Sequence, residues 1–284
     1  MFKSVIVGFD GGEGGRDATA LADLLVSDGG RLTRAFIDNG DPRAWRGAIP
    51  PEEIADLAHG QSPSIGDGLH ELAERIDADL LVVGSSRRGL LGRVLLGDDT
   101  QEALSGAPCA VAIAPLGFGG RERTIARIGV GYNGSPESEH ALRVSRALAR
   151  SLDARLAAFE AVAIPALVTL GAQAPVSIPS DEMIHDALER LAKLPDVEPH
   201  ATYGPAPAEL ERFSESVDLL VVGSRSHGPL GRVVHGSVTR GLARSSRCPL
   251  LVLTRGARER DAEAARAGGH EREGSTAEAV VERG

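Results

Sequence analysis

The stretch Asp79-Leu80-Leu81-Val82-Val83-Gly84-Ser85 occurs a second time as Asp218-Leu219-Leu220-Val221-Val222-Gly223-Ser224. Ten residues after the start of each stretch, Gly89 to Val94 returns as Gly228 to Val233 with a single substitution, at the same offset of 139 residues. Repetition at a constant offset indicates a tandem duplication. Each stretch is a short apolar run that ends in glycine, which is typical of a buried strand in a parallel sheet.

The starts of the two copies also match, but at a different offset. Val7 to Gly11 corresponds to Val130 to Gly134 at an offset of 123 residues. The first copy therefore lacks 16 residues in its middle, which is the difference between the offsets of 139 and 123. We expect the loss to have reduced the second helix of the first copy and to have left a loose loop around Trp45.

Composition limits the classes of function. The chain has 284 residues, a formal net charge of −9 and 3% aromatic residues. The length suits two domains with a core each, and the negative charge argues against nucleic-acid and anionic-membrane partners. Cys109 and Cys248, at equivalent positions, are expected to be buried small side chains. The first residues enter a strand pattern directly, so we expect a cytoplasmic protein.

The second copy shows strands and helices in alternation. Apolar runs at Ile125 to Tyr132, Leu156 to Val162 and Val217 to Val222 predict strands, and Ser135-Pro136-Glu137 predicts the start of a helix. Ser180 is expected to begin another helix that ends at Pro195. The order β-α-β-α-β-α-β-α-β predicts a doubly wound parallel sheet in each copy.

The first copy follows the same order through Phe2 to Gly8, Arg16 to Val26 and Leu32 to Ile37, and then only Glu52 to Ala58 predicts a short helix. The expected domain limits are residues 1–117 for a shortened first domain, 118–124 for a linker and 125–256 for the second domain. Residues 257–284, rich in charged and small residues, predict a disordered tail, with a helix over 258–267 as the alternative.

Ligands of open parallel sheets bind at the carboxyl ends of strands where the winding reverses, which here means the loops after Gly131 and Gly223. Gly223 begins a glycine-dense loop that ends at Gly236-Ser237, where the last helix of the copy starts. Backbone N–H groups of such a loop and a helix N-terminus can hold a phosphate. Arg225, His227 and His235 flank this loop and could contact a ligand or be solvated.

These features resemble the universal stress protein family, whose nucleotide-binding members carry Gly-x2-Gly-x9-Gly-Ser/Thr after the fourth strand and an Asp after the first. The resemblance covers Phe2 to Thr254. In the second copy the pattern falls on Gly223, Ser226, Gly236 and Ser237, so serine replaces the second glycine, and Asn133 stands in place of the Asp. The resemblance implies two flavodoxin-like (adenine-nucleotide-hydrolase-like) domains.

In the first copy the family pattern falls on Asp10, Gly84, Arg87, Gly97 and Asp98. Asp98 would put a carboxylate at the helix end where the resemblance places the phosphate. At a separation of about 5 Å and an effective dielectric near 20, the two negative charges repel by roughly 3 kcal/mol, which lowers the affinity about a hundredfold. We therefore expect no nucleotide triphosphate in this degenerate first site. One hypothesis is that Arg87 pairs with Asp98 and fills it; the alternative is that Asp98 caps a helix and Arg87 is solvated.

The resemblance implies an adenine nucleotide, ATP with or without Mg²⁺, bound mainly in the second copy, and a regulatory role in the stress response. The residues implied to contact it are Asn133, Ala161, Val162, Gly223, Ser224, Arg225, Ser226, Gly236, Ser237 and Val238. It also implies that the two copies pair through Val111 to Ala114 and Leu250 to Leu253. A homodimer of the whole chain and an unknown protein partner remain open.

Other functions find less support in the sequence. Gly129 to Gly134 spells the dinucleotide motif G-x-G-x-x-G, but the first glycine corresponds to Ile6 and is not part of the duplicated pattern. We assign no catalytic residues, no metal ligands and no redox cofactor. The alternatives are a stress scaffold that has lost nucleotide binding and a slow nucleotide hydrolase, for which Asp10 is the one carboxylate at a matched loop position.

Overall fold

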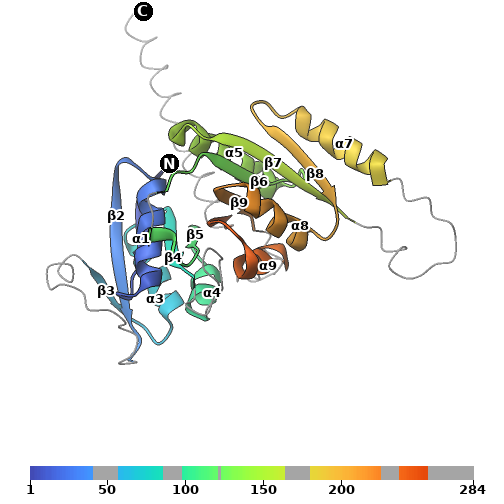
Figure 1. Ribbon diagram of the computed structural model, residues 1–284. Helices are drawn as coiled ribbons and strands as arrows, with labels where there is room; N and C mark the ends of the chain where they lie inside the picture. The colour runs from blue at the N-terminus through green and yellow to red at the C-terminus, as the bar shows by residue number, and fades with distance from the viewer. Residues whose placement is uncertain (41–56, 86–97, 121–122, 164–179, 225–236, 255–284) are drawn as a thin grey trace, which may run out of the picture.

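The fold is described from a computed structural model over residues 1–40, 57–85, 98–120, 123–163, 180–224 and 237–254. Figure 1 shows strands that form a twisted sheet with helices on both of its faces. The expected loop around Trp45 and the tail over 257–284 lie outside the described residues, so both stay predictions. The expected domain limits also stay a prediction.

The first copy contributes five strands and three described helices. Its strands are β1 (Phe2–Gly8), β2 (Val26–Asp38), β3 (Ala58–Gln61), β4 (Leu80–Gly84) and β5 (Ala110–Ala114). Its helices are α1 (Glu13–Leu25), α3 (Ile65–Arg75) and α4 (Asp98–Leu104), and a short 3-10 helix, η1 (Phe118–Gly120), leads toward the second copy.

The second copy contributes five strands and four described helices. Its strands are β6 (Arg127–Gly131), β7 (Arg155–Val162), β8 (Glu198–Tyr203), β9 (Leu219–Gly223) and β10 (Leu250–Leu253). Its helices are α5 (Pro136–Leu152), α7 (Ser180–Ala192), α8 (Ala206–Phe213) and α9 (Ser237–Ser245), with a 3-10 turn, η2 (Ser214–Ser216), after α8.

All ten strands form one sheet in the order β3-β2-β1-β4-β5-β10-β9-β6-β7-β8. Within each copy the strands are parallel, and the strand order reverses beside the first strand, β1 or β6. The predicted α/β fold of two doubly wound parallel sheets is therefore confirmed. The copies join where β5 and β10 run antiparallel, with Val111 opposite Val252 and Ile113 opposite Leu250, which confirms the predicted pairing of the last strands.

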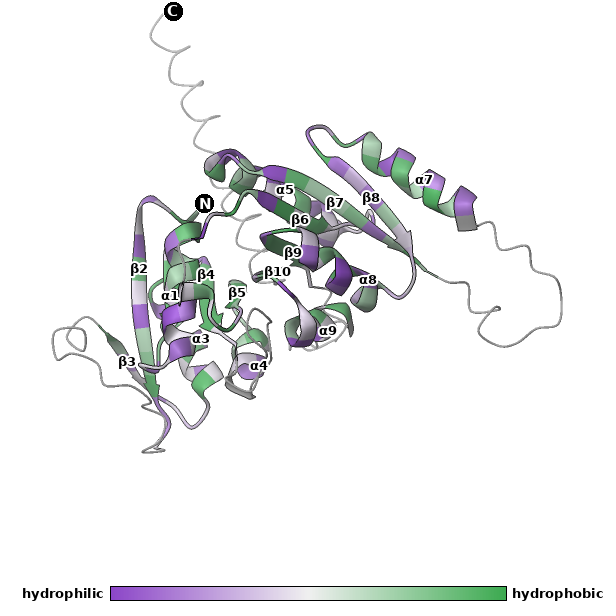
Figure 2. Ribbon diagram, viewed as in Figure 1, coloured by the Kyte–Doolittle hydropathy of each residue, from purple (hydrophilic) through white to green (hydrophobic). Residues whose placement is uncertain are grey.

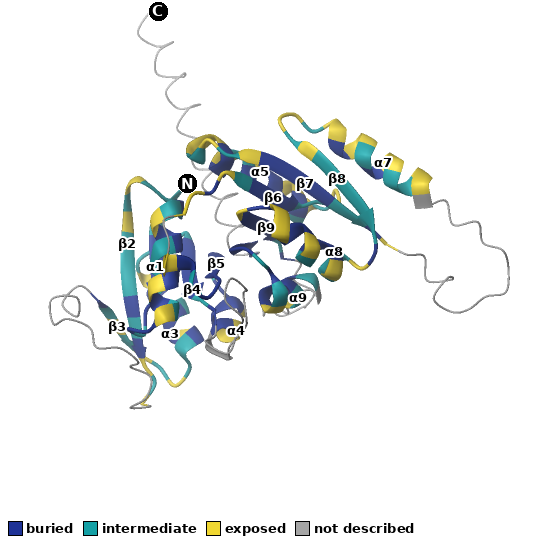
Figure 3. Cartoon of the chain, in the orientation of Figure 1, coloured by how far each residue is buried: buried dark blue, intermediate teal, exposed yellow. Residues whose placement is uncertain are grey.

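The apolar strands are buried between two helical layers. One core lies between the sheet and α1, α5 and α7, and includes Leu21, Leu142 and Leu191. The other lies between the sheet and α3, α4, α8 and α9, and includes Leu72 and Leu210. Both cores contain residues of both copies, so the seam between β5 and β10 is as buried as either domain interior. The apolar and buried strands stand out in Figures 2 and 3.

The repeated stretch begins with an aspartate that clamps the start of the central strand. Asp79 accepts hydrogen bonds from the N–H groups of Lys3 and Ser4, at 2.7 and 3.1 Å. Asp218 does the same for Ala126 and Arg127, at 3.0 and 2.8 Å. Both copies therefore satisfy the leading N–H groups of their central strands with one carboxylate.

Two predicted elements of the first copy differ from the structure. The strand expected over Leu32 to Ile37 begins at Val26, directly after α1. The helix expected over Glu52 to Ala58 is wrong at its last two residues, since Leu57 is not helical and Ala58 begins β3 and pairs with Ala35 of β2; residues 52–56 lie outside the described residues. Pairing along β2 satisfies the backbone of Ala58, and this long-range contact overrides its local helical preference.

The residues after β5 dock on α1. The Asp17 carboxylate, 2% exposed, accepts hydrogen bonds from the N–H groups of Gly117 and Gly119 at 2.8 and 2.7 Å. Burial is the main cause that raises the pKa of Asp17 above its usual value of 3.8, and these two hydrogen bonds oppose it. The connection between the copies is therefore held against the first helix of the first copy.

Candidate functional site

The candidate site lies at the carboxyl end of β6, between β7 and β9, where the strand order reverses (Figure 1). Val130 pairs with Val221 of β9, and Gly131 pairs with Phe159 of β7. Asn133 lies in the bend two residues after β6, Ser224 directly follows β9, and Ala161 is the second-last residue of β7. Three of the predicted residues are therefore at the carboxyl ends of neighbouring strands.

Asn133 shapes the turn that leads from β6 into α5. Its side-chain oxygen accepts a hydrogen bond from the Ser135 N–H at 3.2 Å, and Gly134 between them has a φ of +73°. Ser135 then caps α5, because its hydroxyl accepts from the N–H of Ser138 at 3.3 Å. The Asn133 side chain is exposed, so its amide group is accessible to a ligand.

The first copy builds the same turn with a carboxylate. Asp10 Oδ1 accepts from the N–H of Gly12 at 2.9 Å, and Gly11 also has a φ of +73°. The oxygen of an aspartate and that of an asparagine serve this turn equally. The exchange of Asp for Asn therefore preserves the backbone of the second site while it removes a negative charge.

Ala161 presents backbone groups beside this turn. The ladder between β6 and β7 ends at Gly131 and Phe159, where the Tyr132 N–H donates to the Phe159 carbonyl at 2.9 Å. Successive residues of a strand hydrogen-bond to opposite neighbours, and the Val162 carbonyl accepts from the Gly204 N–H at 3.1 Å on the β8 side. The N–H and C=O of Ala161 therefore face the side on which β6 has already ended.

Ser224 has a hydroxyl group without a partner among the described residues. Its N–H donates to the Leu253 carbonyl at 3.0 Å, as the N–H of Ser85 does to the Ala114 carbonyl at 2.9 Å. The Ser224 side chain is 3% exposed, and its Oγ has no hydrogen-bond partner in the described part of the chain. A buried hydroxyl without a partner is unfavourable unless a ligand or water satisfies it.

Gly223, which the family pattern places at the nucleotide, has a packing role as well. A Cβ built on it would lie 2.4 Å from the Glu137 carbonyl oxygen in the first turn of α5. On Gly84 the same atom would lie 2.2 Å from the Gly14 carbonyl oxygen in α1. Both copies therefore need glycine here because the central helix passes close to the end of the strand.

The other predicted site residues are placed only in part. The side chain of Val162 is buried, and Val238 packs against the core under α9. α9 starts at Ser237 and α4 starts at Asp98, at the expected offset of 139, although their first side chains are outside the description. Arg225, Ser226 and Gly236, and likewise Arg87 and Gly97, lie outside the described residues. The proposed pair between Arg87 and Asp98 stays a hypothesis.

Sequence reasoning missed a polar cluster beside the candidate site. The Tyr132 hydroxyl donates to Glu139 of α5, while Glu160 of β7 accepts from Arg190 of α7 at 2.8 Å. Burial, followed by the hydrogen bond to Glu139, raises the pKa of Tyr132 to about 12. The sequence did contain a signal for this cluster: the first copy has Phe9 at the position of Tyr132, so only the second copy has a hydroxyl group there.

Gly129, the first glycine of the dinucleotide motif, lies within β6 and faces Phe213. A Cβ on it would lie 2.6 Å from the Phe213 ring, which stacks on Phe159 at a centroid distance of 4.7 Å. Ile6 stands at this position in the first copy, fully buried. The missing side chain of Gly129 is thus explained by packing.

Metal and thiol chemistry find no support in the described residues. They contain no group of three or more His, Cys, Asp or Glu side chains that could hold a metal ion. Cys109 and Cys248 are both buried, as expected, and neither is in a disulfide bond; burial raises the pKa of Cys248 to about 12. A thiol with so high a pKa is almost entirely protonated near neutral pH and is a poor nucleophile.

None of the helices in the described segments is long and apolar enough to cross a membrane. This is the structural finding that bears on location.

The sequence matches the model of the "Universal stress protein family" over residues 51–115 and 124–254. A universal stress protein of Mycobacterium tuberculosis is 30% identical over 187 residues, and the alignment spans 62% of this chain and 62% of that relative. A second universal stress protein of the same organism is 28% identical over 206 residues, covering 69% of this chain and 70% of the relative. The chain thus spans less than two thirds of the length of the first of these curated relatives.

Among solved structures, a putative universal stress protein of Pseudomonas aeruginosa aligns with a TM-score of 0.62 at 16% identity, over 89% of this chain and 93% of that one. A universal stress protein of Archaeoglobus fulgidus aligns with a TM-score of 0.59 at 14% identity, over 89% and 98% of the two chains. At such identities the likeness concerns the fold alone.

Proposed function

This chain belongs to the universal stress protein family, and we propose that its second copy binds an adenine nucleotide, ATP with or without Mg²⁺, at the carboxyl ends of β6, β7 and β9. The observation that carries the proposal is that Asn133, Ala161 and Ser224 lie at the carboxyl ends of three neighbouring strands, at the switch point of the sheet. All three offer neutral hydrogen-bonding groups, which suit a nucleoside.

Each of the three groups has a chemical task in this proposal. The Ala161 N–H and C=O supply one donor and one acceptor, which matches the acceptor and donor pair on the edge of adenine. The exposed Asn133 amide reaches a ribose hydroxyl or the base edge, and the Ser224 hydroxyl gains the partner that the described residues do not give it. The phosphates extend toward residues 223–226 and 236–238, where the loop and the start of α9 supply backbone N–H groups.

The first copy is proposed to leave its site without nucleotide. Asp10 adds a carboxylate at the position of Asn133, and Asp38 adds another at the position of Val162. Asp38 is exposed, and its Oδ1 accepts from the Gly40 N–H at 2.9 Å. Ile37 replaces Ala161 with a larger side chain. Negative charge at the base end and at Asp98 weakens the binding of an anionic ligand.

We propose a regulatory protein of the cytoplasm that performs no catalysis of its own. The antiparallel seam between β5 and β10 places the two copies as the two halves of one unit, so nucleotide in the second copy can be sensed across a buried interface. A protein partner then reads the occupied state.

Calorimetric titration of the full-length protein with ATP, ADP and AMP, with and without Mg²⁺, tests the proposal. Ser224→Ala is the sharpest variant, because its hydroxyl has no partner among the described residues, so we expect its removal to leave folding stability unchanged or to raise it. We expect the same change to weaken ATP binding by about tenfold, which corresponds to one hydrogen bond of about 1.4 kcal/mol. Ser85→Ala in the first copy is the matched control and leaves the affinity unchanged.

The absence of ATP, ADP and AMP binding at millimolar concentration would contradict the proposal and favour the scaffold alternative. An affinity equally insensitive to Ser224→Ala and Ser85→Ala would place the nucleotide elsewhere. Sustained phosphate release, abolished together with binding, would instead favour the slow hydrolase.

A further inference from the structure

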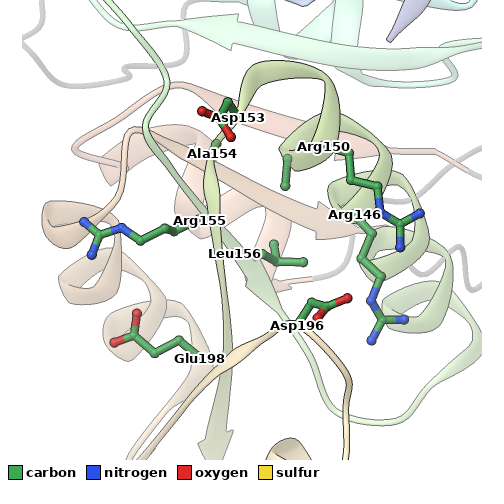
Figure 4. Close-up of a pocket in the computed structure, with 9 residues that line it drawn as sticks. Arg146, Arg150, Asp153, Ala154, Arg155, Leu156, Asp196 and Glu198 are labelled. Atoms are coloured by element: carbon green, nitrogen blue, oxygen red, sulfur yellow. The ribbon is translucent and has the colours of Figure 1, made fainter.

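A cavity of about 460 Å³ lies at the amino ends of β7 and β8, beneath the last turn of α5 (Figure 4). Its floor is apolar and includes Ala149 and Leu156. The candidate nucleotide site is at the carboxyl ends of the strands, so the two sites are at opposite ends of the strands. The size falls within the range of small-molecule pockets and far exceeds the space that a single water fills.

The cavity depends on features that the first copy lacks. α5 continues to Leu152, and Asp153, with a φ of +52°, turns the chain into β7. In the first copy the chain passes from Leu25 of α1 straight into β2 at Val26. At the offset of 123, Asp23 and Ser27 stand at the positions of Arg146 and Arg150. The longer helix and its arginines are specific to the second copy.

Three arginine residues line this cavity. Figure 4 shows Arg146 and Arg150 on one side of Leu156 and Arg155 on the other. Arg146 is fixed by a hydrogen bond from its Nη2 to the Pro195 carbonyl at 3.2 Å, and its buried Nε has no partner among the described residues. Arg150 and Arg155 make no side-chain hydrogen bond or ion pair with another described residue.

Carboxylates also line the cavity, but they do not neutralise the arginines. Glu198 is engaged outside it, by Arg127 at 2.9 Å and His200 at 2.9 Å. Asp153 and Asp196 remain, so the lining carries three arginines and two aspartates that are not engaged elsewhere by a described residue. One positive charge is left for a ligand, and a second negative charge on that ligand would be repelled by the two aspartates.

We propose that this cavity binds a small organic carboxylate. The planar guanidinium fork matches a carboxylate with two parallel hydrogen bonds. The apolar part of the ligand covers Ala149 and Leu156. A single negative charge balances the excess of one guanidinium group over the aspartates.

Residue-resolved NMR of the full-length protein tests this proposal, with hexanoate as the probe. Hexan-1-ol is the neutral comparison, and hexyl phosphate is the dianionic one. The double variant Arg150→Gln/Arg155→Gln changes two exposed side chains, so folding is expected to be unaffected. Arg75→Gln, at the exposed end of α3 in the first copy, is the matched control.

We expect hexanoate to shift the amide signals of residues 150–156 and 196–198 in a saturable way, and the double variant to raise its Kd by about tenfold while Arg75→Gln has no effect. Equal binding of hexan-1-ol, an affinity untouched by the double variant, or the absence of saturable shifts would overturn the proposal. Tighter binding of hexyl phosphate would overturn the assignment to a singly charged carboxylate.

Discussion

The two copies build the same turn at the end of their central strand, yet they surround it with different charges. Asp10 and Asn133 both accept a hydrogen bond from the N–H two residues later, and the glycine between has a φ of +73° in each. Around this shared turn the first copy has Ile37 and Asp38 where the second has Ala161 and Val162. Duplication thus preserved the scaffold of the site, while the groups that a ligand would meet diverged.

The divergence extends to the packing of the central strand, and this is where the largest effect is expected. Phe213→Ala removes a buried aromatic ring and lowers the free energy of unfolding by about 3 kcal/mol. Gly129→Ile, which introduces the residue of the first copy, costs about 2 kcal/mol because the side chain meets the Phe213 ring. Urea denaturation measures each cost.

The double variant Gly129→Ile/Phe213→Ala sharpens this comparison. Isoleucine can occupy part of the volume that the ring leaves. We therefore expect the double variant to lose about 1 kcal/mol less unfolding free energy than the two single variants lose together. If the two losses of unfolding free energy simply added, the isoleucine at position 129 would not fill the space left by the Phe213 ring, and this explanation would be contradicted.

In both copies the central helix passes close to a strand-ending glycine, Gly84 or Gly223, and this shared contact predicts the next effect. Gly84→Ala and Gly223→Ala each place a methyl group against the backbone of the central helix, and each is expected to cost about 2 kcal/mol. Gly120→Ala is the control, because a Cβ there meets nothing within 4 Å, and we expect no measurable change. If one of the two copies tolerated alanine, the shared close approach would not hold.

A smaller effect is expected at the clamps on the central strands. Asp79→Ala and Asp218→Ala each leave two N–H groups without their carboxylate, at a cost of about 1 kcal/mol. Asp79 is the less exposed of the two, so its replacement should cost more. Chemical denaturation of both variants measures the order, and the reverse order would contradict this explanation.

The smallest effect is a dependence of stability on acidic pH that comes from Asp17 in the first copy. The second copy has His140 at the position of Asp17. The raised pKa of Asp17 means that the folded chain keeps the proton of this carboxyl group to a higher pH than the unfolded chain does. The resulting contribution to stability is complete below 3.8, the usual pKa of the group, and is lost as pH rises through the folded pKa. The stability of the unmodified protein minus that of Asp17→Asn should therefore fall as pH rises from 3.8 through the raised pKa of the folded state. A difference that is constant or rises in urea titrations would contradict this.

Much of the fold could be predicted because the repeat tests each inference twice. The apolar runs ending at Gly84 and Gly223 identified the buried fourth strands, and the family resemblance implied that the strands at Val111 and Leu250 join the copies. The early start of β2 at Val26 and the strand at Ala58 were missed, since pairing partners far along the chain decide them.

The candidate site was predictable in its positions but not in its physical detail. The family resemblance placed Asn133 and Gly223, whereas the turn formed by the first and the close helix contact of the second require coordinates. Sequence patterns also cannot show that the Ser224 hydroxyl is buried without a partner, or that the Tyr132 hydroxyl meets Glu139. Such facts depend on how side chains from separate elements meet.

The stoichiometry of ATP binding, measured by calorimetry on the full-length protein and on the paired variants Ser224→Ala and Asp10→Asn/Asp38→Val, tests the central claim most directly. The account predicts one site, weakened by Ser224→Ala, and a second weak site that appears only when the two carboxylates of the first copy are neutralised. Two equal sites in the unmodified protein, or one site that Ser224→Ala leaves intact, would contradict it.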